Sequence, residues 1–362
     1  SSCGGVLLCM PMGCAPALGK FHLQPPGGFA LFLLHFLVPS RGATIWNVGK
    51  PAGHIEIRDD LPDAADFYRD YIQNTGGPFE GIGKPVLFRG AAKKMPAYSL
   101  WTDEYLNEKH GTIVLDQVET EKKETRTALP KENWSLSKFL SKYKSSEIYS
   151  TAVTPKGLSD EVYLLPFMNC GGFLKRLAET VLWFSSGSTK SVIHNDGNHN
   201  VHCMFAGSKD WILWRSTEKI NTAGMGWING EKEAERDPQN FKDAYGTYVG
   251  RIDVDNVDLK RFPGWGKLTW WRVSVQAGDC LYLPPRWYHF VEAPPQRTVS
   301  VHVWFGAADK FESKSCKALE NKGFNASEYL IRIGDCKFGW NGDKLSKCKA
   351  PKTKAKKDPA EL

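Results

Sequence analysis

The chain has 362 residues, of which 41% are hydrophobic and 12% are aromatic, and its formal net charge is +7. This composition excludes a disordered or fibrous protein, and the length allows one large domain or two smaller ones with a packed core. Much of the positive charge lies in the lysine-rich residues 343–357, whereas the other charges are mixed in sign. We therefore expect no nucleic-acid-binding body, and we interpret residues 343–362 as a Lys-rich, solvated tail rather than a site for an acidic polymer.

Residues 1–43 contain an apolar run from Phe29 to Val38, with a lysine before it and small residues after it. The run matches the hydrophobic part of a signal peptide in length and is too short to span a bilayer. We interpret 1–43 as a leader that sends the chain into the secretory pathway, with no membrane span in the mature chain. If the run is instead a buried core segment or a mistranslated leader, a nuclear or cytoplasmic location is the alternative.

Two further features favour the secretory pathway. Residues 133–135 and 325–327 match the acceptor pattern for N-glycosylation. The even number of cysteines beyond the leader fits disulfides formed in an oxidising compartment. The last three predict a stapled C-terminal segment, whereas Cys203 and Cys280 lie in strand-like runs and are interpreted as buried thiols. The six cysteines are Cys170, Cys203, Cys280, Cys316, Cys336 and Cys348.

The predicted elements change in character along the chain. Apolar spacing predicts a helix over 61–73, a buried strand over 84–92 and a Ser-capped helix over 135–143. Runs rich in β-branched and aromatic residues then predict a series of short strands, which is typical of an antiparallel barrel or a double-sheet jelly roll. These strands are 147–153, 180–186, 200–206, 210–215, 270–275, 279–284 and 298–305, with an irregular insertion at 216–262 and a closing helix at 310–323.

The stretch SVIHNDGNHNVHCMF, residues 191–205, combines three histidines with an aspartate. His194 and Asp196 are two residues apart, so in a strand their side chains point to the same face. A third ligand must come from elsewhere, and His289 opens the strand after the Pro-terminated run at 279–284. Two histidines and one carboxylate with open coordination positions form the ligand set of non-haem Fe(II) oxygenases, whereas zinc usually has more nitrogen or sulfur ligands.

The two later histidines of this stretch are rejected as metal ligands. His199 is five residues beyond His194 and points to the opposite face of a regular strand. His202 shares the face of His194 but lies roughly 26 Å along a straight strand.

Five segments carry recognisable motifs, namely 84–106, 181–196 (VLWFSSGSTKSVIHND), 202–214 (HCMFAGSKDWILW), 275–293 (VQAGDCLYLPPRWYHFVEA) and 298–305 (TVSVHVWF). In this order they resemble the JmjC branch of the cupin-type Fe(II)/2-oxoglutarate oxygenases, nearest to the small JmjC protein hydroxylases. The resemblance implies a mainly β fold, a double-stranded β-helix or jelly roll with flanking N- and C-terminal helices. We divide the chain into a leader (1–43), an N-terminal α/β flank (44–140), the JmjC/cupin barrel (141–308), a C-terminal helical segment (309–342) and the tail (343–362).

The resemblance also assigns roles to individual residues. His194, Asp196 and His289 would bind Fe(II), and Lys209 would pair with the distal carboxylate of the cosubstrate 2-oxoglutarate. A fixed cation is needed where a doubly charged acid enters an apolar barrel. His302 stands where close members of the family carry Asn, so it either hydrogen-bonds the cosubstrate or adds a metal ligand. The other cosubstrate residues that the resemblance implies are Ser191, Tyr149 and Asn200.

The activity implied by the resemblance is a dioxygenase reaction. Oxidative decarboxylation of 2-oxoglutarate by dioxygen would be coupled to hydroxylation of a C–H bond in a protein or peptide side chain. The first alternative is lysine demethylation on histones, which the leader and the glycosylation patterns disfavour. The second is a secreted or matrix protein on a cupin scaffold without catalysis, which the intact ligand set disfavours. The sequence indicates no oligomeric state.

Overall fold

The computed structural model describes residues 43–124, 132–218, 248–249, 252–339 and 346–349. The predicted leader up to residue 42, most of the predicted insertion and most of the Lys-rich tail lie outside the described residues.

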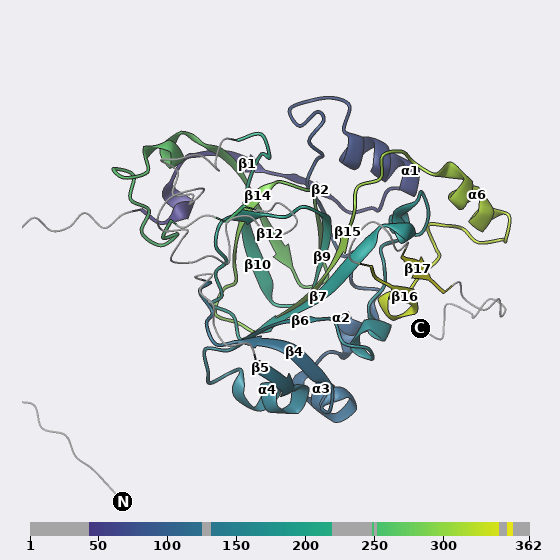
Figure 1. Cartoon of the computed structure of the whole chain (residues 1–362), viewed down its shortest axis with the longest axis horizontal. Helices are drawn as coiled ribbons and strands as arrows, with labels where there is room; N and C mark the ends of the chain where they lie inside the picture. The colour runs from purple at the N-terminus through teal and green to yellow at the C-terminus, as the bar shows by residue number, and fades with distance from the viewer. Residues whose placement is uncertain (1–42, 125–131, 219–247, 250–251, 340–345, 350–362) are drawn as a thin grey trace, which may run out of the picture. The chain divides into compact units, whose positions relative to one another are not determined.

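Two large sheets make up most of the fold (Figure 1). The six-stranded sheet contains, in spatial order, β1 (Lys50–His54), β12 (Thr269–Gln276), β10 (Ser208–Trp214), β14 (Tyr288–Glu292), β8 (His194–Asn195) and β11 (Tyr248–Val249). The nine-stranded sheet contains β2 (Glu56–Arg58), β3 (Val86–Phe88), β13 (Cys280–Leu283), β9 (His199–Ala206), β15 (Thr298–Phe305), β7 (Leu177–Ser185), β6 (Tyr149–Val153), β4 (Val114–Glu119) and β5 (Glu132–Ser135).

The connections between the two sheets confirm the predicted jelly roll. Strands β7, β9, β13 and β15 form the centre of one sheet, and β8, β10, β12 and β14 belong to the other. The chain therefore crosses from sheet to sheet at nearly every connection, and the central pairs are antiparallel. Because side chains alternate along each strand, one set from each sheet faces the interior between them. Aromatic and β-branched residues fill much of that interior.

The helices are short and lie outside the two central sheets. The predicted helix at 61–73 is present as α1 (Ala64–Phe67), which Asp63 caps, followed by a π-helical turn at Tyr68–Gln73. The predicted Ser cap is also present, since Ser135 Oγ accepts from the Lys138 N–H at the start of α4 (Leu136–Lys142). The other α-helices of the described residues are α2 (Pro96–Leu100), α3 (Asp103–His110) and α6 (Ser313–Glu320). Among the described residues no helix is both long and apolar enough to cross a membrane.

Two predicted boundaries need correction. The strand predicted over 84–92 ends at Phe88, because the chain turns at Gly90, which has a positive φ of 67° and donates its N–H to Asp279 Oδ1. The predicted insertion is not wholly irregular either. Its strand β11 pairs with β8, with Val249 opposite His194, and so covers the outer edge of the six-stranded sheet.

All six cysteines of the described residues form disulfides. The interpretation of Cys203 and Cys280 as buried thiols is wrong, because they lie directly opposite each other on β9 and β13 with their Cα atoms 4.1 Å apart. Such pairs cannot be recognised until the strands are placed side by side. The predicted C-terminal staple is confirmed by the disulfide that joins two short strands, β16 (Cys336–Lys337) and β17 (Lys347–Cys348).

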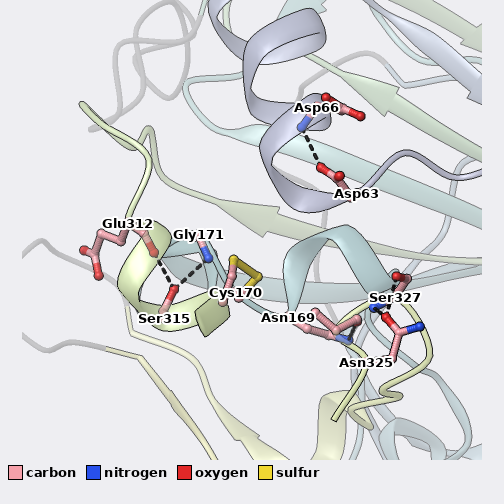
Figure 2. The surroundings of a disulfide bond; sticks show 11 residues. Asp63, Asp66, Asn169, Cys170, Gly171, Glu312, Ser315, Asn325 and Ser327 are labelled. Atoms are coloured by element: carbon pink, nitrogen blue, oxygen red, sulfur yellow. Dashed lines mark hydrogen bonds between the residues drawn. A yellow bond between two sulfur atoms is a disulfide. The ribbon is translucent and has the colours of Figure 1, made fainter. Parts of the chain in front are cut away.

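The third disulfide, Cys170–Cys316, fastens α6 to the loop before β7 (Figure 2). Beside it, the Gly171 N–H donates to Ser315 Oγ at 2.8 Å. The neighbouring turn carries Asn325, and the side chain of Asn169 donates to the Ala326 carbonyl at 3.3 Å. The predicted glycosylation acceptor at 325–327 thus lies on a turn that is held to the body of the protein.

Candidate metal centre

The structure brings His194, Asp196 and His289 together at one point. His194 lies on β8 and His289 directly opposite it on the antiparallel strand β14. One potential ligand atom from each of the three residues lies within 4.8 Å of the other two. The intervening Asn195 does not line the cavity and donates its side-chain N–H to the Arg286 carbonyl. The alternation used to group His194 with Asp196 is therefore present in the structure.

Backbone carbonyls set the orientation of both imidazoles. His194 Nδ1 donates to the Val192 carbonyl at 2.9 Å, and His289 Nδ1 donates to the Trp287 carbonyl at 3.0 Å. A carbonyl only accepts, so the ring proton is on Nδ1 and the lone pair is on Nε2 in both rings. Such hydrogen bonds are the usual means by which a metal-binding histidine is fixed in one tautomer.

The carboxylate of Asp196 completes the cluster. Its Oδ2 lies 3.7 Å from His289 Nε2. The turn that leads into β14 is tied to the same residue, because the N–H of Arg286, which has a positive φ of 67°, donates to the Asp196 carbonyl at 2.7 Å. Two imidazole nitrogens and one carboxylate oxygen form a donor set that fits Fe(II) with coordination positions left open.

These three side chains line a cavity of about 350 Å³ between the two sheets. A cavity of that size accommodates a small ligand beside a metal ion. Side chains of β4, β6, β7, β9 and β15 form one wall, and those of β8, β10 and β14 with neighbouring loop residues form the other. The lining includes every residue that the sequence assigned to the metal or the cosubstrate, namely Tyr149, Ser191, His194, Asp196, Asn200, Lys209, His289 and His302.

Lys209 places a buried cation in this cavity. It is 4% exposed and lies near the start of β10, directly after the turn at Gly207 (φ 70°), where a Cβ would lie 2.3 Å from the Arg297 carbonyl oxygen. Burial lowers the pKa of Lys209 to about 7, although the negative charge of Glu124 opposes this shift. The Lys209 ammonium lies 5.1 Å from the centre of the Trp183 ring. Within the described residues no carboxylate forms an ion pair with it, so an anionic ligand would gain a strong partner here.

Three of the predicted cosubstrate residues line the same cavity and differ in the contacts they make with the rest of the protein. Ser191 Oγ accepts from the Val291 N–H at 2.8 Å and keeps its own proton to donate. The ring of Tyr149 packs 5.6 Å from Trp183. Asn200 is 3% exposed, and its Oδ1 accepts no hydrogen bond from any described residue. Their roles toward a ligand remain predictions.

The tautomer of His302 favours one of the two roles considered for it. The indole N–H of Trp183 donates to His302 Nδ1 at 3.0 Å, so the ring proton of the neutral imidazole is on Nε2. Burial lowers the pKa of His302 well below its usual value and keeps the ring neutral. Nε2 then acts as a hydrogen-bond donor and not as a metal ligand.

The two rejected histidines differ from one another. His199 stacks on Phe305 and Tyr282 in the apolar core, although it lies on β9 and not on the strand of His194, so strand alternation is not the reason. His202 does not line the metal cluster itself, but the reason given for rejecting it is wrong. The chain turns at Gly197, so β8 and β9 belong to different sheets and His202 returns to line the cavity. The Asp-Gly pair at 196–197 is a turn signal that would have predicted this break.

A family model described as a cupin-like domain matches residues 78–311 of the chain. The lysine-specific demethylase JMJ30 of Arabidopsis thaliana is 26% identical over 291 residues, which cover 77% of this chain and 59% of that protein. The human HSPB1-associated protein 1 is 41% identical over 127 residues, or 35% of this chain and 23% of that protein. The human bifunctional peptidase and (3S)-lysyl hydroxylase JMJD7 is 23% identical over 139 residues, or 34% of this chain and 40% of that protein. The chain thus spans less than two thirds of the length of these relatives.

Replacing the buried cation should stabilise the ligand-free protein. We expect Lys209→Met to raise the free energy of unfolding by roughly 2–5 kcal/mol at pH values below the Lys209 pKa. The unfolded lysine keeps its ordinary pKa of 10.5, so the folded state pays the full cost of the buried charge below pH 7 or so. As the pH rises toward 10.5, this cost and the advantage of the variant should shrink. Urea unfolding of the wild type and the variant at a series of pH values measures the gain in unfolding free energy and its dependence on pH.

Lys190→Met is the matched control for this prediction. Lys190 lies at the cavity rim, and its ion pairs with Asp255 and Glu292 raise its pKa despite partial burial. Its replacement should bring no gain in stability at any pH. A Lys209→Met protein that is less stable than the wild type below neutral pH would contradict the electrostatic account.

Proposed function

The chain belongs to the family of cupin-like, JmjC-type domains, and on this premise we propose that it is an Fe(II)/2-oxoglutarate-dependent dioxygenase that hydroxylates a protein side chain in the secretory pathway. The family includes 2-oxoglutarate oxygenases such as lysine demethylases and hydroxylases. One observation carries the proposal for this chain. His194, Asp196 and His289 converge in the same cavity that holds the buried cation of Lys209.

Fe(II) would be held by three ligand atoms: Nε2 of His194, Nε2 of His289 and a carboxylate oxygen of Asp196. When bound, Fe(II) together with 2-oxoglutarate and dioxygen supplies the oxidation of a C–H bond. The protein's part is to hold the two imidazoles in the tautomer that binds a metal and to keep the cavity walls largely shielded from water. His289 is 2% exposed, and Trp211 packs 5.5 Å from its ring.

Lys209 would pair with the distal carboxylate of 2-oxoglutarate. The binding of a dianion would raise the pKa of this lysine back above neutrality, because the charged form then has a partner. Ser191 and Tyr149 would offer hydroxyl groups to the same carboxylate, while Asn200 and His302 would line the cosubstrate. These assignments are proposals that the shared cavity supports.

We infer the compartment from the disulfides and from the glycosylation acceptor pattern at 325–327. Disulfides persist in oxidising compartments and are rare in the cytosol and nucleus, and the described part of the chain carries three. Asn325 and Ser327 are both exposed, and the Ser327 hydroxyl donates to Asn325 Oδ1 at 2.8 Å (Figure 2). These features support the secretory pathway over the nucleus, and they therefore favour hydroxylation over the alternative of histone lysine demethylation. The other alternative is a secreted or matrix protein that uses the cupin fold without catalysis. The presence of all three candidate metal ligands disfavours it.

Metal binding can be tested by the visible spectrum. Under anaerobic conditions the wild-type protein with Fe(II) and 2-oxoglutarate should show a weak charge-transfer band. His194→Ala should abolish this band, because only two of the three ligands remain. His199→Gln is the control: the residue is buried on the same stretch but faces the apolar core, so the band should persist. The absence of a band from the wild type, or its persistence in His194→Ala, would rule out the proposed enzyme.

The compartment has its own test at Asn325. Expressed in animal cells with its own residues 1–43 and no added leader, the protein should carry an N-linked glycan at this residue, and Asn325→Gln should remove the mass of one glycan. Asn321→Gln is the matched control, since Asn321 lies in the same region without an acceptor pattern. Intact-mass spectrometry before and after enzymatic deglycosylation makes the comparison. An unmodified Asn325, in secreted protein or in protein that stays in the cytosol, would contradict the prediction.

A further inference from the structure

Two buried imidazoles lie side by side on one wall of the cavity. His202 on β9 and His302 on β15 are direct partners in the antiparallel ladder, so their side chains share one face of the sheet. They are 3% and 2% exposed, and their ring centres are 6.3 Å apart. Both line the cavity that holds Lys209 and the metal cluster. They lie within electrostatic reach of Lys209, whose positive charge lowers the pKa of each.

His202 also lies close to the three candidate metal ligands. Its ring makes an edge-on contact with Trp211 at 5.2 Å, and Trp211 in turn packs on the metal-cluster residue His289. The pKa of His202 is lowered well below its usual value, chiefly by burial and further by Lys209 and His302. His202 is therefore neutral and carries one N–H group and one lone pair, whichever nitrogen holds the proton.

Apart from the bond that His302 Nδ1 accepts from Trp183, the described residues do not use the hydrogen-bonding capacity of this pair. Neither ring nitrogen of His202 has a hydrogen-bond partner among the described residues, and neither has Nε2 of His302. A buried polar group without a partner costs the fold about 1–3 kcal/mol. Two such groups on one cavity wall therefore point to a ligand that satisfies them, since an apolar side chain at either position would avoid that cost.

We propose that His202 and His302 are specificity-determining residues for the cosubstrate, each donating an N–H to the carboxylate that pairs with Lys209. The inference rests on the proposed function, which supplies the dicarboxylate. The ammonium of Lys209 and the two imidazoles come from β10, β9 and β15, and they take three of the about four lone-pair sites of a carboxylate. One site is left for a hydroxyl of Ser191 or Tyr149. Neutral imidazoles suit this position because they add hydrogen bonds without a second buried charge next to the lysine. The pair selects acids that end in a carboxylate over those that end in an apolar group.

The test compares two ligands on matched variants. With Mn(II) in place of iron, calorimetry measures the binding of 2-oxoglutarate and of 2-oxopentanoate, which has the same carbon chain but ends in a methyl group. His202→Phe should weaken 2-oxoglutarate binding by roughly tenfold or more, since hydrogen bonds to charged groups are the strong ones. It should leave the affinities for 2-oxopentanoate and for Mn(II) unchanged. His202→Gln, which keeps an N–H donor, should restore most of the lost affinity.

Two further variants complete the design. His199→Phe makes the same substitution at an equally buried histidine of the same strand that faces the core, and it should not alter the affinity for either acid. His302→Leu removes the second donor and should show the same selective loss as His202→Phe, so the proposal can be tested even if one variant does not fold.

The possible outcomes separate the two proposals. If the wild type binds 2-oxoglutarate but His202→Phe and His302→Leu bind it equally well, or lose affinity for both acids alike, the pair does not recognise the distal carboxylate and the inference is overturned. If the wild type with Mn(II) does not bind 2-oxoglutarate at all, the proposed function fails, and the inference with it.

Discussion

The pairing of β8 with β14 is the constraint on which the candidate centre depends. It is a short ladder, with His194 opposite His289 and Asn195 opposite Tyr288. A shift of one residue would turn every side chain of one strand to the other face and separate the two imidazoles. The Arg286 N–H, bound to the Asp196 carbonyl, and β11, paired on the outer edge of β8, hold this register from both sides. Backbone carbonyls two residues before each histidine then fix the ring nitrogens.

The second feature is a polar cavity inside an apolar fold. Lys209 is buried with its pKa lowered to about 7, and the neutral rings of His202 and His302 lie on the facing wall with donors that no described residue uses. Each of these groups costs stability in the absence of a ligand. Such costs are typical of functional sites, where the fold is maintained by the surrounding core. The proposed cosubstrate, reaching from the candidate metal ligands toward Lys209, would account for all of these groups together.

Local sequence patterns were sufficient for the central strands, because runs rich in β-branched and aromatic residues bounded by Gly and Pro are a strong local signal. They left a barrel and a jelly roll open, and the family resemblance indicated the jelly roll. Placing the metal cluster required more than periodicity. Strand alternation grouped His194 with Asp196, whereas His289 was proposed from its place after the Pro-terminated run at 279–284 and then supported by the family resemblance. Long-range pairing explains what was missed. The partnership of Cys203 with Cys280 depends on which strands become neighbours, and His202 was misjudged because a straight strand was assumed across the turn at Gly197.

The most direct test of the account is a crystal structure of the protein grown with Mn(II) and 2-oxoglutarate. We predict a single metal ion held by Nε2 of His194, Nε2 of His289 and a carboxylate oxygen of Asp196, with the distal carboxylate of the cosubstrate at Lys209. A metal bound through the Nδ1 atoms, a metal held by other residues, or a metal-free cavity in such crystals would contradict the central claim.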